Sequence, residues 1–292
     1  MTSRLVTPVY IIIALMILPT VVLAQEFEGI IRQRSIHVNL EFLQDMLWDE
    51  EDEPDYSDEA EYYAGQARKL FDLPMARIES MAATGEADIT HSTVHVKGSR
   101  LRISGASEAE GYMVYDLESG TFRLVNPQER TYLEYSRADM EEQQRRTQQM
   151  MAQFGADMAE METEMDDGSD GGRRPEALGR SEVINGFQTA AYEVRANGQF
   201  GRGWCAADDS RLVQSFEALA AQAASFEDEE EGSDLEDLLC EGQLPIRVHT
   251  FDPSLGDYGI DEIVAIDRTS VSDELFAIPA GYKRISMEEM WR

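Results

Sequence analysis

The chain has 292 residues, with 57 Asp and Glu against 25 Lys and Arg, and a formal net charge of −32 at neutral pH. Such a surface repels phosphate backbones and anionic lipid headgroups, which argues against nucleic acid as a partner. It suits a basic protein partner, divalent cations or a salty medium. The alternative is that the excess of acidic residues forms a uniformly solvated surface that keeps the protein soluble.

Residues 1–24 have the pattern of a cleavable signal peptide. Arg4 precedes an apolar run over 9–18, and Val22 and Ala24 occupy the two positions that signal peptidase reads. The apolar stretch is shorter than the ~20 residues of a membrane-spanning helix, which argues against the alternative of an uncleaved anchor. We therefore expect export to the periplasm or the exterior, a single domain over 25–292, and no stable transmembrane anchor after cleavage.

The two cysteines, Cys205 and Cys240, are separated by 35 positions. An oxidising compartment favours an intramolecular disulfide between them, and two buried free thiols are the alternative. Neither cysteine has a second Cys or His at zinc-finger spacing, so no metal site is predicted there.

The N-terminal part predicts one strand followed by an acidic helical insertion. Residues 25–38 are rich in β-branched side chains, as in a strand. Apolar residues then recur at helical spacing over 40–83, on both sides of a run at 49–61 that holds nine acids and no base.

From Glu86 the apolar residues alternate with polar ones, with turn sequences about every ten residues as far as Tyr135. This pattern predicts an antiparallel meander. A helix rich in Met is predicted over 138–165, either lining a plastic apolar groove or packing as an ordinary helix face. A flexible linker follows at 166–175.

The C-terminal part predicts a second β region. The pairs Asn185-Gly186 and Asn197-Gly198 are typical of tight hairpin turns. A short helix over 211–226 and a second acid run over 227–237 lead to final strands at 246–251 and 258–271.

No catalytic or metal-binding constellation stands out. His91 and His95 lie four residues apart in a predicted strand, which places their side chains about 13 Å apart on one face, too far to share a metal ion. Residues 166–171 look only faintly like a calcium loop, because Gly168 stands at a ligand position. No Gly-x-Ser-x-Gly elbow is present. The sequence therefore predicts no enzyme, no cofactor and no metal.

Five segments, in this order, resemble a known bacterial family: Val96–Arg102, Val114–Leu117, Leu124–Tyr132, Gly179–Gly186 and Leu275–Tyr282. The chain is similar to the domain-of-unknown-function family 4412, which is grouped by fold with the LolA/LolB-type lipoprotein carriers. The resemblance spans roughly 27–285 in islands, and the sequence departs from it at 40–83 and 227–237.

The resemblance implies an α+β fold: an incomplete, curved antiparallel β-barrel of LolA-like type, with covering helices and the acidic helical insertion. In the carriers, the concave face holds acyl chains. The expected apolar wall consists of Leu101, Ile103, Met113, Tyr115, Phe122, Leu124, Tyr132, Tyr192, Val194 and Trp204.

Two hypotheses for function follow. In the first, the protein binds a lipid or another apolar ligand along this wall. In the second, the same residues fill the barrel, and the acidic surface binds a basic protein partner. Alternation alone does not distinguish a hollow barrel from a filled one.

Overall fold

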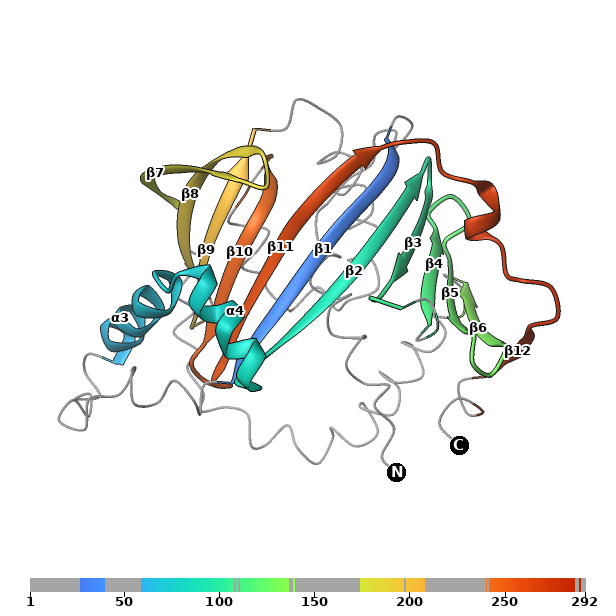
Figure 1. The fold of residues 1–292 in the computed structure, drawn as a ribbon, viewed down its shortest axis with the longest axis horizontal. Helices are drawn as coiled ribbons and strands as arrows, with labels where there is room; N and C mark the ends of the chain where they lie inside the picture. Colours follow the sequence, from blue (N-terminus) through green and yellow to red (C-terminus); the bar gives the residue numbers. More distant parts are fainter. Residues whose placement is uncertain are drawn as a thin grey trace, which may run out of the picture.

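The computed structural model describes residues 27–39, 59–107, 109, 111–136, 139, 174–196, 198–207, 240, 242–286 and 289. Its strands form one sheet of 12 strands in the order β12-β6-β5-β4-β3-β2-β1-β11-β10-β9-β8-β7 (Figure 1). The first strand of the chain, β1 (Glu28–Asn39), lies inside the sheet between β2 and β11. On one side of β1 the chain adds strands outward, from β2 to β6, and on the other side it begins at the edge with β7 and returns inward to β11.

One half of the sheet is the predicted meander of consecutive antiparallel strands. It contains β2 (Ala87–Lys97), β3 (Arg100–Ser104), β4 (Tyr112–Asp116), β5 (Thr121–Asn126) and β6 (Thr131–Ser136). The other half contains β7 (Glu176–Ile184), β8 (Phe187–Ala196), β9 (Gln199–Ala206), β10 (Leu244–Asp252) and β11 (Asp257–Arg268). The predicted hairpin turn Asn185-Gly186 joins β7 to β8, and both residues adopt the positive φ that such a turn requires.

The sheet is open, with β12 (Lys283–Ile285) at one edge and β7 at the other. The last short strand, β12, runs parallel to β6, whereas every other pairing among the described strands is antiparallel. The architecture is predominantly β, and the described residues include two α-helices longer than one turn. An α+β class fits this composition. The sequence analysis did not predict β12, which pairs in parallel because the chain first crosses to the far edge of the sheet.

Two helices form a hairpin in the predicted helical insertion: α3 (Glu59–Phe71) and α4 (Met75–Thr84). Pro74 precedes α4, and Gly85 ends it in a left-handed conformation. Several predicted segments lie outside the described residues: the signal peptide at 1–24, most of the acid run at 49–61, and the segments at 140–165, 166–173, 211–226 and 227–237.

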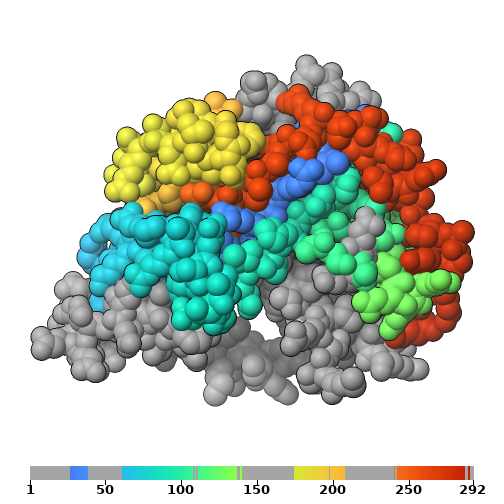
Figure 2. All heavy atoms as spheres, viewed as in Figure 1, coloured from blue at the N-terminus to red at the C-terminus, as the bar shows by residue number. Residues whose placement is uncertain are grey.

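One face of the sheet is covered by two parts of the chain, and we call it the covered face. Ile30 and Ile36 are six residues apart in β1 and therefore point to the same face. Ile36 packs in a cluster with Leu70 of α3 and Ile78 of α4. Ile30 packs against a second cluster that contains Phe276, from the short 3-10 helix η3 (Asp273–Phe276). Figure 2 shows these two covers, the helical hairpin in cyan and the C-terminal segment in red, with strands visible between them.

Candidate functional site

The opposite face carries two continuous rows of apolar side chains, and we call it the ladder face. Residues directly opposite each other on neighbouring strands point to the same face of a sheet. Strand pairing aligns one row from β1 to β6, made of Ile31, Val94, Ile103, Met113, Leu124 and Leu133. It aligns a second row from β2 to β6, made of Val96, Leu101, Tyr115, Phe122 and Tyr135.

Six of the ten predicted wall residues lie in these two rows: Leu101, Ile103, Met113, Tyr115, Phe122 and Leu124. Tyr192 and Val194 lie on the same face in the other half of the sheet, opposite Gly203 and Gly201 of β9. Tyr132 and Trp204 lie on the covered face. Tyr132 pairs with Val125 and packs against the C-terminal segment, and Trp204 pairs with Ala191 and Arg247.

The rows differ in burial along their length. Met113 and Leu101 are buried, whereas Ile103, Phe122 and Leu124 keep part of their surface exposed to solvent. Such partly exposed side chains still gain about 25 cal/mol for each Å² of apolar surface removed from water. The ladder face therefore offers a favourable surface for an apolar molecule.

Along β1 and β2 the ladder face changes from apolar to polar. Ile31 and Val94 are followed, two residues further along the face, by the pair Gln33 and Ser92, whose side chains are joined by a hydrogen bond of 3.3 Å. Beyond them, Ser35 donates a hydrogen bond to the Asp261 carboxylate. Burial raises the pKa of Asp261, although the bond from Ser35 acts in the opposite direction. This end of the face is suited to polar groups and not to hydrocarbon.

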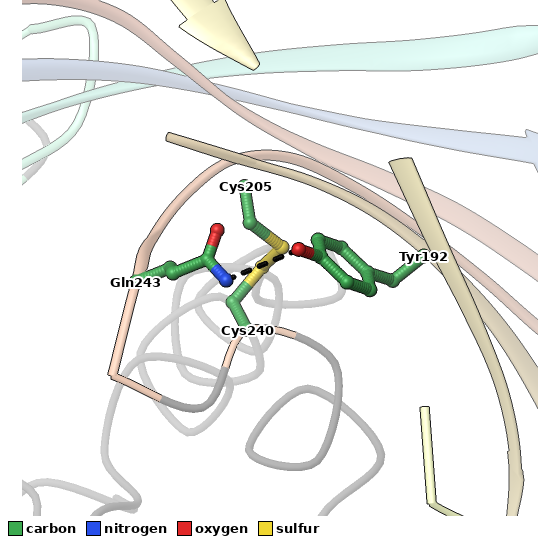
Figure 3. Close-up of a disulfide and its surroundings, with 4 residues drawn as sticks. All are labelled: Tyr192, Cys205, Cys240 and Gln243. Carbon is green, nitrogen blue, oxygen red and sulfur yellow. Dashed lines mark hydrogen bonds between the residues drawn. A yellow bond between two sulfur atoms is a disulfide. The ribbon is translucent and has the colours of Figure 1, made fainter. Parts of the chain in front are cut away.

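The predicted disulfide lies at the other end of the sheet. Cys205 and Cys240 are joined, with their Cα atoms 5.6 Å apart, and both are buried. They cluster with Val194, and Tyr192 packs against them; Gln243 donates a hydrogen bond of 3.3 Å to the Tyr192 hydroxyl (Figure 3). The disulfide therefore ties the end of β9 to the residue that leads into β10, beside two of the predicted wall residues.

The covered face holds a buried ionic network that the sequence patterns did not indicate. The Glu262 carboxylate, 2% exposed, accepts a hydrogen bond of 2.6 Å from Arg247 Nε and one of 2.7 Å from Asn185 Nδ2. Arg202, 4% exposed, forms ion pairs of 2.5 Å with Glu193 and 2.6 Å with Asp72. No local sequence signal marks these residues, because both faces of β9 are buried and the order of the strands decides which charges meet.

A histidine lies at the centre of this network. The His249 ring is 4.8 Å from the ring of Trp204, and its Nδ1 is 2.8 Å from the hydroxyl of Tyr258. Burial, assisted by Arg247 and Arg202, lowers the pKa of His249 to about 3. Burial also raises the pKa of Tyr258. Both side chains are therefore neutral at physiological pH.

Within the described ranges, no three His, Cys, Asp or Glu side chains are grouped so that they would hold a metal ion. His91 and His95 both lie in β2, opposite Arg34 and Ile30 on the covered face. No helix among the described residues has the length and hydropathy of a membrane span.

Comparison with solved structures gives only remote likenesses. The crystal structure of an uncharacterized conserved protein from Thermus thermophilus is 7% identical, with a TM-score of 0.37, over 88% of this chain and 90% of that one. PNGF-II in its P21 crystal form is 6% identical, with a TM-score of 0.33, over 90% of this chain and 32% of that one. No protein with a curated description is similar enough in sequence to match.

The family comparison is informative. The model of a family described as a domain of unknown function, DUF4412, matches residues 143–282. The match covers two of the five segments on which the sequence resemblance depends, at 179–186 and 275–282, and it extends across β7 to β11 and η3. A little under half of the chain, over residues 143–282, is therefore similar to the DUF4412 family.

Proposed function

We propose that the ladder face binds an apolar ligand of the acyl-chain class, in an exported protein whose sheet acts as a LolA-like half-barrel. The observation that carries this proposal is the pair of apolar rows, which hold eleven residues without a polar interruption across up to six strands. The covered face is packed against α3, α4 and the C-terminal segment. Part of the ladder face is also buried in the core, including Ile31, Val94 and Leu101. The ligand would therefore bind over the partly exposed side chains of Ile103, Phe122 and Leu124.

The polar end of the ladder face supports an amphipathic ligand. An acyl chain would lie along the rows, and a polar headgroup would lie near Gln33, Ser92 and Ser35. The disulfide between Cys205 and Cys240 supports export, because disulfides persist in oxidising compartments.

A titration with a fluorescent fatty acid tests the proposal, using the chain over 25–292 purified without detergent. Leu124→Gln places a polar amide in the first apolar row, and we expect it to weaken binding by about 10- to 100-fold, the equivalent of burying one leucine side chain. The matched control is Leu255→Gln, which makes the same chemical change at a leucine that is 77% exposed in the turn between β10 and β11. Equal binding by both variants would argue against a ligand on the ladder face.

The net charge of −32 favours a second candidate, an interaction module that binds a basic protein partner through its acidic surface. The test compares the 25–292 chain with a variant that lacks residues 49–61. The second candidate is favoured if the 25–292 chain captures a basic partner, the variant does not, and fatty-acid binding is unchanged or absent. A fatty-acid affinity that survives the deletion, with no partner captured, would favour the first.

A further inference from the structure

The end of α3 is fixed to the sheet through a buried histidine. The Tyr258 hydroxyl donates a hydrogen bond of 3.1 Å to the backbone carbonyl of Leu70, in the last turn of the helix. A hydroxyl has one proton to donate, so its oxygen accepts the proton on His249 Nδ1 across 2.8 Å. The contact between helix and sheet therefore uses a neutral imidazole protonated at Nδ1.

The other ring nitrogen of His249 has nothing to donate to. Nε2 is buried and has no hydrogen-bond partner among the described residues. The ring lies 4.8 Å from the Trp204 ring and 5.9 Å from the Phe71 ring, which belongs to α3. A second proton would create a buried N–H group without an acceptor, at a cost of about 1–3 kcal/mol before the charge itself is counted.

The charged groups around His249 disfavour an imidazolium still further. Arg202 on β9 pairs directly opposite His249, and Arg247 lies two residues away on β10. The nearby carboxylates are held by these two arginines: Asp72 and Glu193 by Arg202, and Glu262 and Glu182 by Arg247. Arg180 of β7 adds a further cation, bound to Asp72. A protonated His249 would face two cations whose counterions are already engaged.

We propose that the α3–α4 hairpin is a pH-operated cover, and that protonation of His249 releases the hairpin from the covered face. Release breaks the contact from Tyr258 to Leu70, removes Phe71 from the ring and gives water access to Nε2. The strand residues that pack against the hairpin, including Phe251 and Ile260, are then exposed. This device does not depend on what the ladder face binds.

The pH range of opening follows from the difference between the pKa of His249 in the closed form and its pKa in the open form. With the cover closed, the pKa of His249 is about 3, against an ordinary value of 6.5. The open form therefore binds the proton more tightly, and opening is favoured as pH falls below about 6.5 until it levels off near 3. One proton changes the opening equilibrium about tenfold for each pH unit within that window.

Hydrogen–deuterium exchange of the full chain measures this opening directly. We expect the protection factors of peptides from 66–82, corrected for intrinsic rates, to fall about tenfold for each unit between pH 6 and pH 4. Peptides from β1 and β11 should keep their protection over the same range. Equal loss of protection in hairpin and strands, or no change in the hairpin, would overturn the proposal.

Two variants identify the sensor. His249→Gln keeps a neutral donor toward Tyr258 and should make the hairpin's protection nearly independent of pH. Asp72→Asn removes the exposed carboxylate that pairs with Arg202, and the tenfold slope should remain. Loss of the slope in Asp72→Asn would make Asp72 the sensor and contradict the proposal, and this comparison stands even if His249→Gln fails to fold.

Discussion

Glu262 on β11 and Arg247 on β10 form an ion pair of 2.6 Å in which the carboxylate side chain is only 2% exposed. Arg34 of β1 adds a longer contact of 3.3 Å to the same carboxylate, and Asn185 donates to it from the turn between β7 and β8. One buried acid therefore connects the first strand of the chain, two late strands and a hairpin turn.

Removing this acid should be costly. We expect Glu262→Ala to lower the free energy of unfolding by about 3–5 kcal/mol, because it leaves the buried Arg247 guanidinium with only the longer pair of 3.3 Å to the half-exposed Glu182. Asp267→Ala is the control, since the pair between Asp267 and Arg32 is about half exposed and such pairs contribute under ~1 kcal/mol. Urea denaturation of both variants checks this, and similar losses in the two would show that burial does not set the value of the pair.

The disulfide should stabilise the fold mainly by restricting the unfolded chain. Replacing both Cys205 and Cys240 with Ser opens a loop of 35 residues, and the chain-entropy model gives a loss of about 3–4 kcal/mol. The measurement is urea denaturation of the double variant and of the wild type, with and without a reducing agent. A loss below ~1 kcal/mol would mean that the unfolded chain is already restricted in this region.

Two glycines should respond to alanine in opposite directions. At Gly29 of β1 a Cβ atom would collide with the Asp267 carbonyl oxygen and lie 2.8 Å from the Phe27 ring, so Gly29→Ala should destabilise by about 1–3 kcal/mol. At Gly65 of α3 nothing lies within 4 Å, so Gly65→Ala should stabilise by about 0.5–1 kcal/mol through helix propensity. Thermal unfolding of the two variants tests the signs. Stabilisation by Gly29→Ala would contradict the strand geometry at Gly29, and destabilisation by Gly65→Ala would contradict the open space at Gly65.

The Asp72 carboxylate should add stability above its own titration range. Burial acts to raise its pKa, but the hydrogen bonds and charges of Arg202 and Arg180 outweigh this effect, and its pKa lies below the ordinary 3.8. Its contribution is therefore complete above about pH 4 and is lost as pH falls through the depressed pKa. We expect Asp72→Asn to cost about 1 kcal/mol at neutral pH, because the carboxylate is half exposed. The difference in unfolding free energy between wild type and variant should be constant between pH 8 and pH 5 and shrink below pH 4. A difference that grows below pH 4 would mean that folding raises the pKa of Asp72.

The sequence predicted the meander and the hairpin turns well, because the two-residue period of a strand is a local property. Alternation also placed Met113 and Phe122 on one face with their neighbours. It failed for Tyr132, since apolar residues stand on both sides of β6 and only its pairing with β5 decides which face each one occupies. Trp204 failed for the related reason that both faces of β9 are buried.

The buried ionic network was not predictable from local patterns. Arg202, Arg247 and Glu262 look like solvated surface charges in the sequence. Their pairing depends on the order of the strands β8 to β11 and on the turn at Asn185, which brings residues from distant parts of the chain together. The parallel pairing of β12 depends on the same long-range information.

Mass spectrometry of organic extracts from the 25–292 chain, purified without detergent, tests the central claim most directly. We predict that a fatty acid or lipid is recovered in stoichiometric amount from the wild type and is depleted in Leu124→Gln but not in Leu255→Gln. Extracts without lipid, from a protein that is well folded by circular dichroism and does not bind added fatty acid, would contradict the claim and indicate that the ladder face is only a packed core.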